Sequence, residues 1–287
     1  MSIAKILVPV TGTPRDEMAI AAAARMAKLC NAHMQVQFVH PDPASAVPLL
    51  GVPLSGDIMQ AIIDGQTKFA QAAGARARQT MVDICRRESI EIVKRPEHRA
   101  EASCAFREVW GNAGRLIVDS ARLSDLVVFG PVHWRDSSEI NEAFLDVLRS
   151  VRRPVLVGNS PNVGQLRKIA IGWDGSIVAA RAICAVMAIL QRAEQSDVLI
   201  VHRKGGPSVP TQELTDYLVR NGVKFETHAV ATADKSPAEM LINEATVSGA
   251  DMLVVGGYGH DHLWETIFGG ATDTLLANAK IPVLIGH

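Results

Sequence analysis

Four short apolar segments occur twice in this 287-residue chain, in the same order, and this internal repeat restricts the chain to two copies of one architecture. The matched segments are 5–10 with 168–173, 37–40 with 199–202, 125–130 with 251–256, and 154–158 with 282–286. The length is also close to twice the ~150 residues of a typical domain. We therefore expect two domains, residues 1–160 and 164–287.

Each repeated segment is four to six residues long and almost continuously apolar, which is typical of strands buried on both faces of a parallel sheet. Helix-forming stretches lie between them, at 19–29 and 179–190, and a third begins with a capping pattern at 236–239. Alternating strands and helices predict the α/β class. We expect two tandem doubly wound domains, each with a parallel sheet of about five strands.

The first copy has an insertion, at about 41–100, that the second lacks. A loop containing several prolines and glycines, 41–56, leads into a long amphipathic helix at about 59–87, and the next strand is expected near 104–110. The second copy reaches its third strand, 225–230, through the short helical stretch 211–221. We interpret the insertion as a surface elaboration or an interface helix.

Composition argues against several classes of protein. The net charge is −1 and only 5% of residues are aromatic, so the chain lacks the features of a nucleic-acid-binding protein. The longest apolar stretch, 182–190, is too short to cross a bilayer, and the first apolar run is too short for a signal peptide. The cysteines Cys30, Cys85, Cys104 and Cys184 are scattered, so no disulfide is expected. These features predict a cytoplasmic protein.

Ligands of open α/β sheets bind beyond the carboxyl ends of the strands. In the second copy, Asp174 follows the first strand, and Gly256 and Gly259 follow the fourth. Nine residues later, Gly269 precedes a helical segment. Glycine backbone and a helix N-terminus together form a good binding site for phosphate, so this pattern predicts an anion site.

This spacing resembles the G-2x-G-9x-G-[S/T] nucleotide signature of the universal stress proteins, whose fold is of the adenine nucleotide alpha hydrolase-like type. The resemblance covers the second half and implies that Asp174 holds the ribose or adenine, that the backbone at Val201 borders the base, and that the glycines hold phosphates. The implied nucleotide-binding residues are Asp174, Val201, Gly256, Gly259, His260, Gly269, Gly270, Ala271 and Thr272. Gly270 stands where the signature has Ser or Thr, and Thr272 is a candidate to replace that hydroxyl.

The first half resembles the same family in framework but lacks the signature. Thr11 takes the place of Asp174, Pro131 follows Gly130 where a backbone donor is needed, and the bulk of residues 143–144 aligns with Gly269. We expect one nucleotide site, in the second half only. Members of the family pair through their last strands, which implies that the halves pack about a pseudo-twofold axis, as an intrachain pseudo-dimer, with a homodimer as a further option.

Simpler interpretations of the same residues remain open. Glycine turns are common after strands, and Asp174 is also suited to a turn or a helix N-cap. His260 and His262 lie two residues apart in a loop, and we interpret them as solvated, so no metal site is expected. Trp134, Trp173 and Trp264 are interpreted as packing residues.

The resemblance implies an adenine-nucleotide (ATP/AMP)-binding stress-response or regulatory protein. Its ligand is ATP or another adenine nucleotide, with Mg²⁺ as an accompanying ion. The chain has no P-loop, nucleophile elbow or dinucleotide fingerprint, so we do not expect an enzyme. The alternative is a stress or interaction module that binds no nucleotide and acts through protein partners, with the inserted helix as its contact surface.

Overall fold

The computed structural model describes residues 3–42, 55–95, 100–131, 139–160, 165–202, 211–231, 237–257, 276 and 279–286. In the first half the strands are β1 (Lys5–Val10), β2 (His33–His40), β3 (Glu91–Ile92), β4 (Ser103–Trp110), β5 (Leu126–Phe129) and β6 (Val155–Val157). In the second they are β7 (Lys168–Trp173), β8 (Gln195–His202), β9 (Phe225–Ala231), β10 (Met252–Gly256) and β11 (Val283–Gly286). The repeated apolar segments therefore all contain strands, as the sequence predicts.

These strands form one 11-stranded sheet in the order β3-β4-β2-β1-β5-β6-β11-β10-β7-β8-β9. Neighbouring described strands are parallel except β6 and β11, which pair antiparallel with Leu284 opposite Leu156. The expected α/β class with a mostly parallel sheet is confirmed. The two halves arrange their strands in the same way on either side of the β6–β11 pair. Moving outward from that pair, the first half runs β6-β5-β1-β2-β4 and the second half runs β11-β10-β7-β8-β9.

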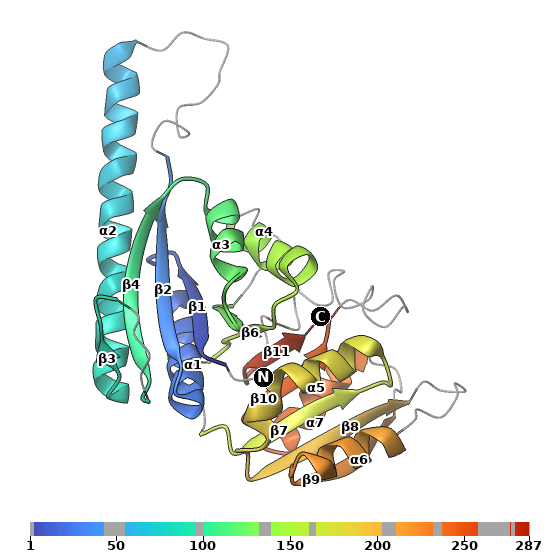
Figure 1. Cartoon of the computed structure of the whole chain (residues 1–287). Coiled ribbons are helices and arrows are strands. Elements are labelled where there is room, and N and C mark those ends of the chain that lie inside the picture. The colour runs from blue at the N-terminus through green and yellow to red at the C-terminus, as the bar shows by residue number, and fades with distance from the viewer. Residues whose placement is uncertain are drawn as a thin grey trace.

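Helices cover both faces of the sheet (Figure 1). The described helices are α1 (Arg15–Cys30), α2 (Gly56–Glu88), α3 (Ala113–Ala121), α4 (Glu139–Asp146), α5 (Ile177–Leu190), α6 (Gln212–Arg220) and α7 (Pro237–Val247), and α4 continues into a π-helical segment, Val147–Val151. Alternate strand residues enter different cores: Ile6 packs in the core that includes α1, α2, α5 and α6, whereas Leu7 packs with α3, α4 and α7. A sheet buried on both faces explains the continuously apolar strands.

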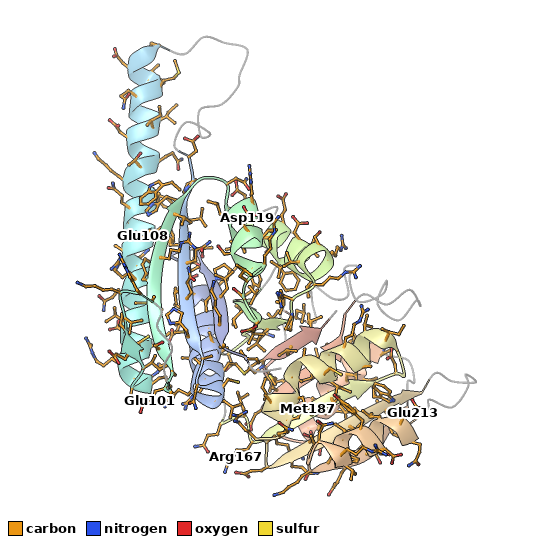
Figure 2. The ribbon with its side chains drawn as sticks, viewed as in Figure 1. Glu101, Glu108, Asp119, Arg167, Met187 and Glu213 are labelled. Atoms are coloured by element: carbon orange, nitrogen blue, oxygen red, sulfur yellow. The ribbon has the colours of Figure 1, made fainter. Side chains whose placement is uncertain are left out.

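The long helix α2 has two parts. Its first buried residue is Ala70, so about 20 Å of helix precedes the part that packs on the sheet. Figures 1 and 2 show this part projecting beyond the sheet. Ile58 and Phe69 in it are 51% and 68% exposed. At the other end, buried Glu88 forms ion pairs with Arg25 (3.1 Å) and Lys28 (3.5 Å) of α1.

All four cysteines are free thiols, as expected. Among the described helices, none combines the length and the apolar character needed to cross a membrane.

Candidate nucleotide site

The candidate site lies at the carboxyl ends of β7 and β10. The chain passes from β7 to its neighbour β8, and later returns to the other side of β7 as β10. Such a reversal of strand order opens a crevice at the carboxyl ends of the two strands. Asp174 directly follows β7, and Gly256 is the last residue of β10, so the structure brings these two predicted residues to the same crevice.

Of the other predicted residues, one lies on a neighbouring strand and the rest lie outside the described part of the chain. Val201 belongs to β8, the neighbour of β7. Gly259, His260, Gly269, Gly270, Ala271 and Thr272 all fall in segment 258–275, outside the described residues, as does His262.

Asp174 and Ser176 shape the turn that follows β7. Oδ1 of Asp174 accepts a hydrogen bond from the Ser176 amide (3.0 Å), and Gly175 has φ +78°. Ser176 Oγ then accepts from the Ala179 amide (3.2 Å) and so caps α5. Asp174 therefore has a turn role, while the helix cap that sequence analysis weighed for it belongs to Ser176. The sequence indicates this cap, because Ser176 follows a glycine and directly precedes an apolar helical stretch.

Gly256 has a packing role in addition to its predicted contact with ligand. A Cβ atom on Gly256 would lie 2.5 Å from the backbone nitrogen of Ala179, in the first turn of α5. Gly130, at the matching place after β5, would similarly carry its Cβ 2.8 Å from the carbonyl oxygen of Arg15. The nucleotide signature predicts only a ligand contact for Gly256. Glycine occurs at the matching position in both halves, Gly130 and Gly256, and this repetition indicates a close contact between helix and sheet.

In the first half, a buried carboxylate occupies the backbone donors of the corresponding turn. Asp16 accepts hydrogen bonds from the amides of Thr11 (3.0 Å) and Gly12 (2.7 Å). Burial raises the pKa of Asp16 above its ordinary value, and hydrogen bonds from Thr11, Gly12 and Thr13 partly offset this effect. The role of Asp16 is not predicted from the sequence, because the helix-forming pattern starts at Ala19, whereas α1 begins at Arg15.

The segment of the first half that aligns with Gly269 is α4. Ala143 and Phe144 are fully buried there, and the Phe144 ring packs edge-on against Phe129 with centroids 5.4 Å apart. The sequence predicts that the bulk of these two residues blocks a ligand; in the structure both side chains fill the hydrophobic core. The first turn of α4 is acidic, and Glu139 accepts a hydrogen bond from the Ala113 amide (2.7 Å) at the start of α3.

Two cavities lie near these turns. One, of about 570 Å³, is lined by the ends of β1 and β5, including Thr11, Phe129 and Pro131. The other, of about 450 Å³, lies between α5 and α6 and is lined by residues that include Trp173 and Tyr217. In the first half α2 packs closely on the turn after β1. A Cβ atom at Gly12 would overlap the Ala73 carbonyl oxygen, and Arg76 Nε donates a hydrogen bond to the Gly12 carbonyl (3.0 Å).

Comparisons with known proteins agree with this architecture. Residues 165–287 match the model of the universal stress protein family. A search of curated proteins found no match. A universal stress protein from Archaeoglobus fulgidus is similar in structure, with a TM-score of 0.69, 13% identity, and 99% of this chain and 96% of that chain covered.

Two structures from Pseudomonas aeruginosa are also similar: a functionally unknown protein of strain PAO1 and a putative universal stress protein of strain UCBPP-PA14. Each has a TM-score of 0.52 and 15% identity, and covers 99% of this chain and 92% of its own. At these identities the likeness concerns the fold. Together with the family match, it shows that residues 165–287 contain one universal stress protein domain.

Proposed function

We propose that this chain is an adenine-nucleotide-binding stress-response or regulatory protein with one site, in the crevice between the ends of β7 and β10. The observation that carries the proposal is the location of Asp174 and Gly256 at this reversal of strand order, within a domain that matches the universal stress protein family. The spacing from Gly256 and Gly259 to Gly269 supports phosphate binding at the same place. Asp174, partly exposed, is available to accept hydrogen bonds from ribose or adenine.

The proposal includes a second, degenerate domain of the same kind in residues 1–160, related to the first by a pseudo-twofold axis. Three structural features support it. The two halves share an order of strands, β6 and β11 join them antiparallel, and α1 and α5 each approach a strand-ending glycine.

We propose only one nucleotide site per chain because of the negative charges and the occupied hydrogen-bond donors in the first half. The Thr11 and Gly12 amides already donate to Asp16, so they are not free for a phosphate oxygen. Glu139 and Glu142 place negative charge in the first turn of α4, where an anionic ligand would benefit from the helix dipole. This half is therefore unsuited to a nucleotide phosphate.

Calorimetric titration with ATP, AMP and adenosine tests the proposal. We expect one site per chain, and Asp174→Ala should weaken all three ligands about tenfold to a hundredfold, because hydrogen bonds to a charged group contribute about 1.5–3 kcal/mol each. Thr11→Ala, the matched change in the first half, is the control and should leave affinity unchanged. Two equivalent sites, or an equal effect of both variants, would contradict the proposal.

The glycine signature allows a second test. Gly269→Val should weaken ATP binding strongly, because its side chain would occupy space that phosphate oxygens need. Gly270→Ser restores the hydroxyl of the family signature and should tighten ATP more than adenosine, since the added contact is to phosphate. If the folded Gly269→Val protein binds ATP as well as the wild type, the phosphate site is not where we propose.

A second candidate function is an interaction module that binds no nucleotide. The projecting part of α2, with exposed Ile58, Met59 and Phe69, favours it. The absorbance spectrum of protein purified without added nucleotide separates the candidates. An adenine maximum released on denaturation supports the nucleotide site, whereas its absence together with no ATP binding in calorimetry supports the interaction module.

A further inference from the structure

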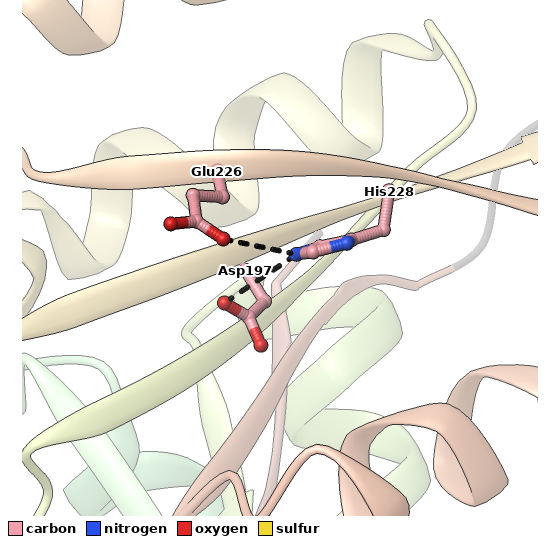
Figure 3. A group of neighbouring side chains, drawn as sticks. All are labelled: Asp197, Glu226 and His228. Atoms are coloured by element: carbon pink, nitrogen blue, oxygen red, sulfur yellow. Dashed lines mark ion pairs between the residues drawn. The ribbon is translucent and has the colours of Figure 1, made fainter.

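Three potential metal ligands converge at the outer edge of the second half of the sheet. Asp197 on β8 lies directly opposite Glu226 on the neighbouring edge strand β9, and His228 follows two residues later. Side chains two residues apart share a face of a strand, so all three lie on one face. Figure 3 shows the His228 ring directed towards the carboxylates of Asp197 and Glu226, with a dashed line to each. Asp197 and Glu226 are near the starts of their strands, away from the crevice at the carboxyl ends.

The separations among these groups suit a bound ion better than hydrogen bonds. His228 Nε2 lies 3.7 Å from Asp197 Oδ1 and 3.9 Å from Glu226 Oε2. Both distances are too long for a hydrogen bond. All three donor atoms lie within 4.8 Å of one another. An ion held tetrahedrally by bonds of about 2.0–2.2 Å separates its ligand atoms by about 3.3–3.6 Å. A small side-chain adjustment would therefore bring the three donor atoms to distances suited to one ion.

Burial and charge support the same interpretation. The Asp197 side chain is only 3% exposed, and Lys168 Nζ holds its Oδ2 at 2.9 Å, so that Oδ1 faces His228. Glu226 and His228 are 72% and 46% exposed, which leaves a route for an ion from solvent. Asp197 and Glu226 carry two negative charges against the one positive charge of Lys168, and this excess of negative charge favours binding of a cation.

We propose that Asp197, Glu226 and His228 bind a divalent transition-metal ion of the zinc type, with water completing its coordination. One imidazole and two carboxylates are ligands that zinc accepts, and three protein ligands with an open position form a recognised zinc arrangement. Lys168 acts as a positioning residue for the Asp197 carboxylate. The histidines that the sequence pattern singles out as possible metal ligands are His260 and His262. The sequence feature that points to the site proposed here is the Glu-x-His pair on the predicted strand 225–230.

Zinc titration of the full-length chain against a chromophoric chelator, without nucleotide, tests this proposal. We expect one zinc ion to bind. His228→Ala and Glu226→Gln should each weaken it by at least about 10–100-fold, since even the loss of an outer partner of a metal ligand has an effect of this size. His33→Ala is the matched control, because His33 is also a strand histidine but hydrogen-bonds Ser103 Oγ (2.9 Å). It should leave zinc affinity unchanged.

Cobalt substitution provides an independent readout. The visible absorption of bound Co²⁺ should appear in the wild type and in His33→Ala, and should be lost in His228→Ala. Glu226→Gln is exposed and nearly isosteric, so it tests the ligand set without disturbing the fold. The proposal is overturned if no zinc binds, if His228→Ala binds zinc as the wild type does, or if binding is lost in His262→Ala instead.

Discussion

At the scale of single residues, the two halves use glycine in the same way but surround it differently. Gly12 and Gly175 follow β1 and β7 with φ values of +76° and +78°, in the left-handed region that glycine adopts without strain. The backbone of α2 packs against Gly12, so that a side chain at Gly12 would clash with the backbone of Ala73. Gly175 is exposed and lines the cavity between α5 and α6.

Replacement of Gly12 by alanine should therefore be strongly destabilising. The left-handed conformation costs a residue with a side chain about 1–2 kcal/mol, and the clash with Ala73 forces α2 to move, so we expect a loss of about 2–5 kcal/mol in the free energy of unfolding. Gly222→Ala is the matched control, because Gly222 has φ +70° with nothing within 4 Å of its Cβ position. Denaturant unfolding of both variants measures the difference. Equal losses in the free energy of unfolding for the two variants would show that contact with α2 does not restrict residue 12.

The positions of Asp174 and Gly256 at strand ends are predictable from the sequence, because continuous apolar runs mark both strands. The hydrogen bonds of Asp16 are not predictable in this way, because they depend on a side chain at the start of α1 reaching back to the preceding turn. Such a contact requires the helix start to be known to within one residue, and apolar periodicity does not give that precision. Asp197 and Glu226 were missed for a related reason, because their proximity depends on the register of β8 with β9.

At the scale of elements, α2 shows how far the apolar pattern determines structure. Its predicted range, 59–87, agrees closely with the observed Gly56–Glu88. The pattern does not show that the first turns leave the sheet, since Ile58 and Ile62 continue the apolar spacing. Which part of an amphipathic helix finds a partner depends on the size of the sheet, and that is a tertiary property. The two-residue strand β3 was also unpredicted, because so short a segment has no periodicity.

Two glycines within α2 should respond in opposite ways to alanine. Gly65 lies in the projecting part with nothing within 4 Å of its Cβ position, so Gly65→Ala should stabilise the local helix by about 1 kcal/mol. Gly74 is buried, with Glu108 Oε1 3.2 Å and the Phe38 ring 3.3 Å from that position. The cost of displacing these side chains, about 1–3 kcal/mol, opposes the gain in helix propensity of about 1 kcal/mol, so Gly74→Ala should give a net loss of up to about 2 kcal/mol.

Hydrogen exchange and denaturant unfolding distinguish these effects. Gly65→Ala should slow amide exchange near residues 58–67 and leave global stability unchanged, because those turns open without exposing the core. Gly74→Ala should lower the unfolding midpoint. A global stabilisation by Gly65→Ala would mean that the projecting turns unfold together with the sheet.

At the scale of the whole molecule, the pairing of β6 with β11 joins the strands of the two halves into one sheet. Leu156 and Leu284 face each other there and are almost completely buried. Helices α1 and α5 also contact each other across the junction. The pairing of the last strands agrees with the sequence-based expectation.

Separation of the halves should expose this junction. Residues 165–287 alone would present β11 as an unpaired apolar edge, and such edges promote association. We expect that fragment to form dimers or larger species in light scattering, whereas the same measurement on the full chain gives the reference without an exposed junction. A fragment that stays monomeric at high concentration would contradict this expectation.

The continuous sheet has a consequence for how such a molecule can diversify. When two identical subunits meet across a strand pair, each mutation enters both sides at once, and a change useful on one side must be tolerated on the other. Here the two sides are encoded separately. A 33-residue α2 and a carboxylate that fills the turn after β1 are present on one side, whereas the other side has the nine-residue α6 and an exposed glycine in the turn after β7. Covalent joining thus allows the two sides of the junction to carry different residues, which two identical subunits cannot do.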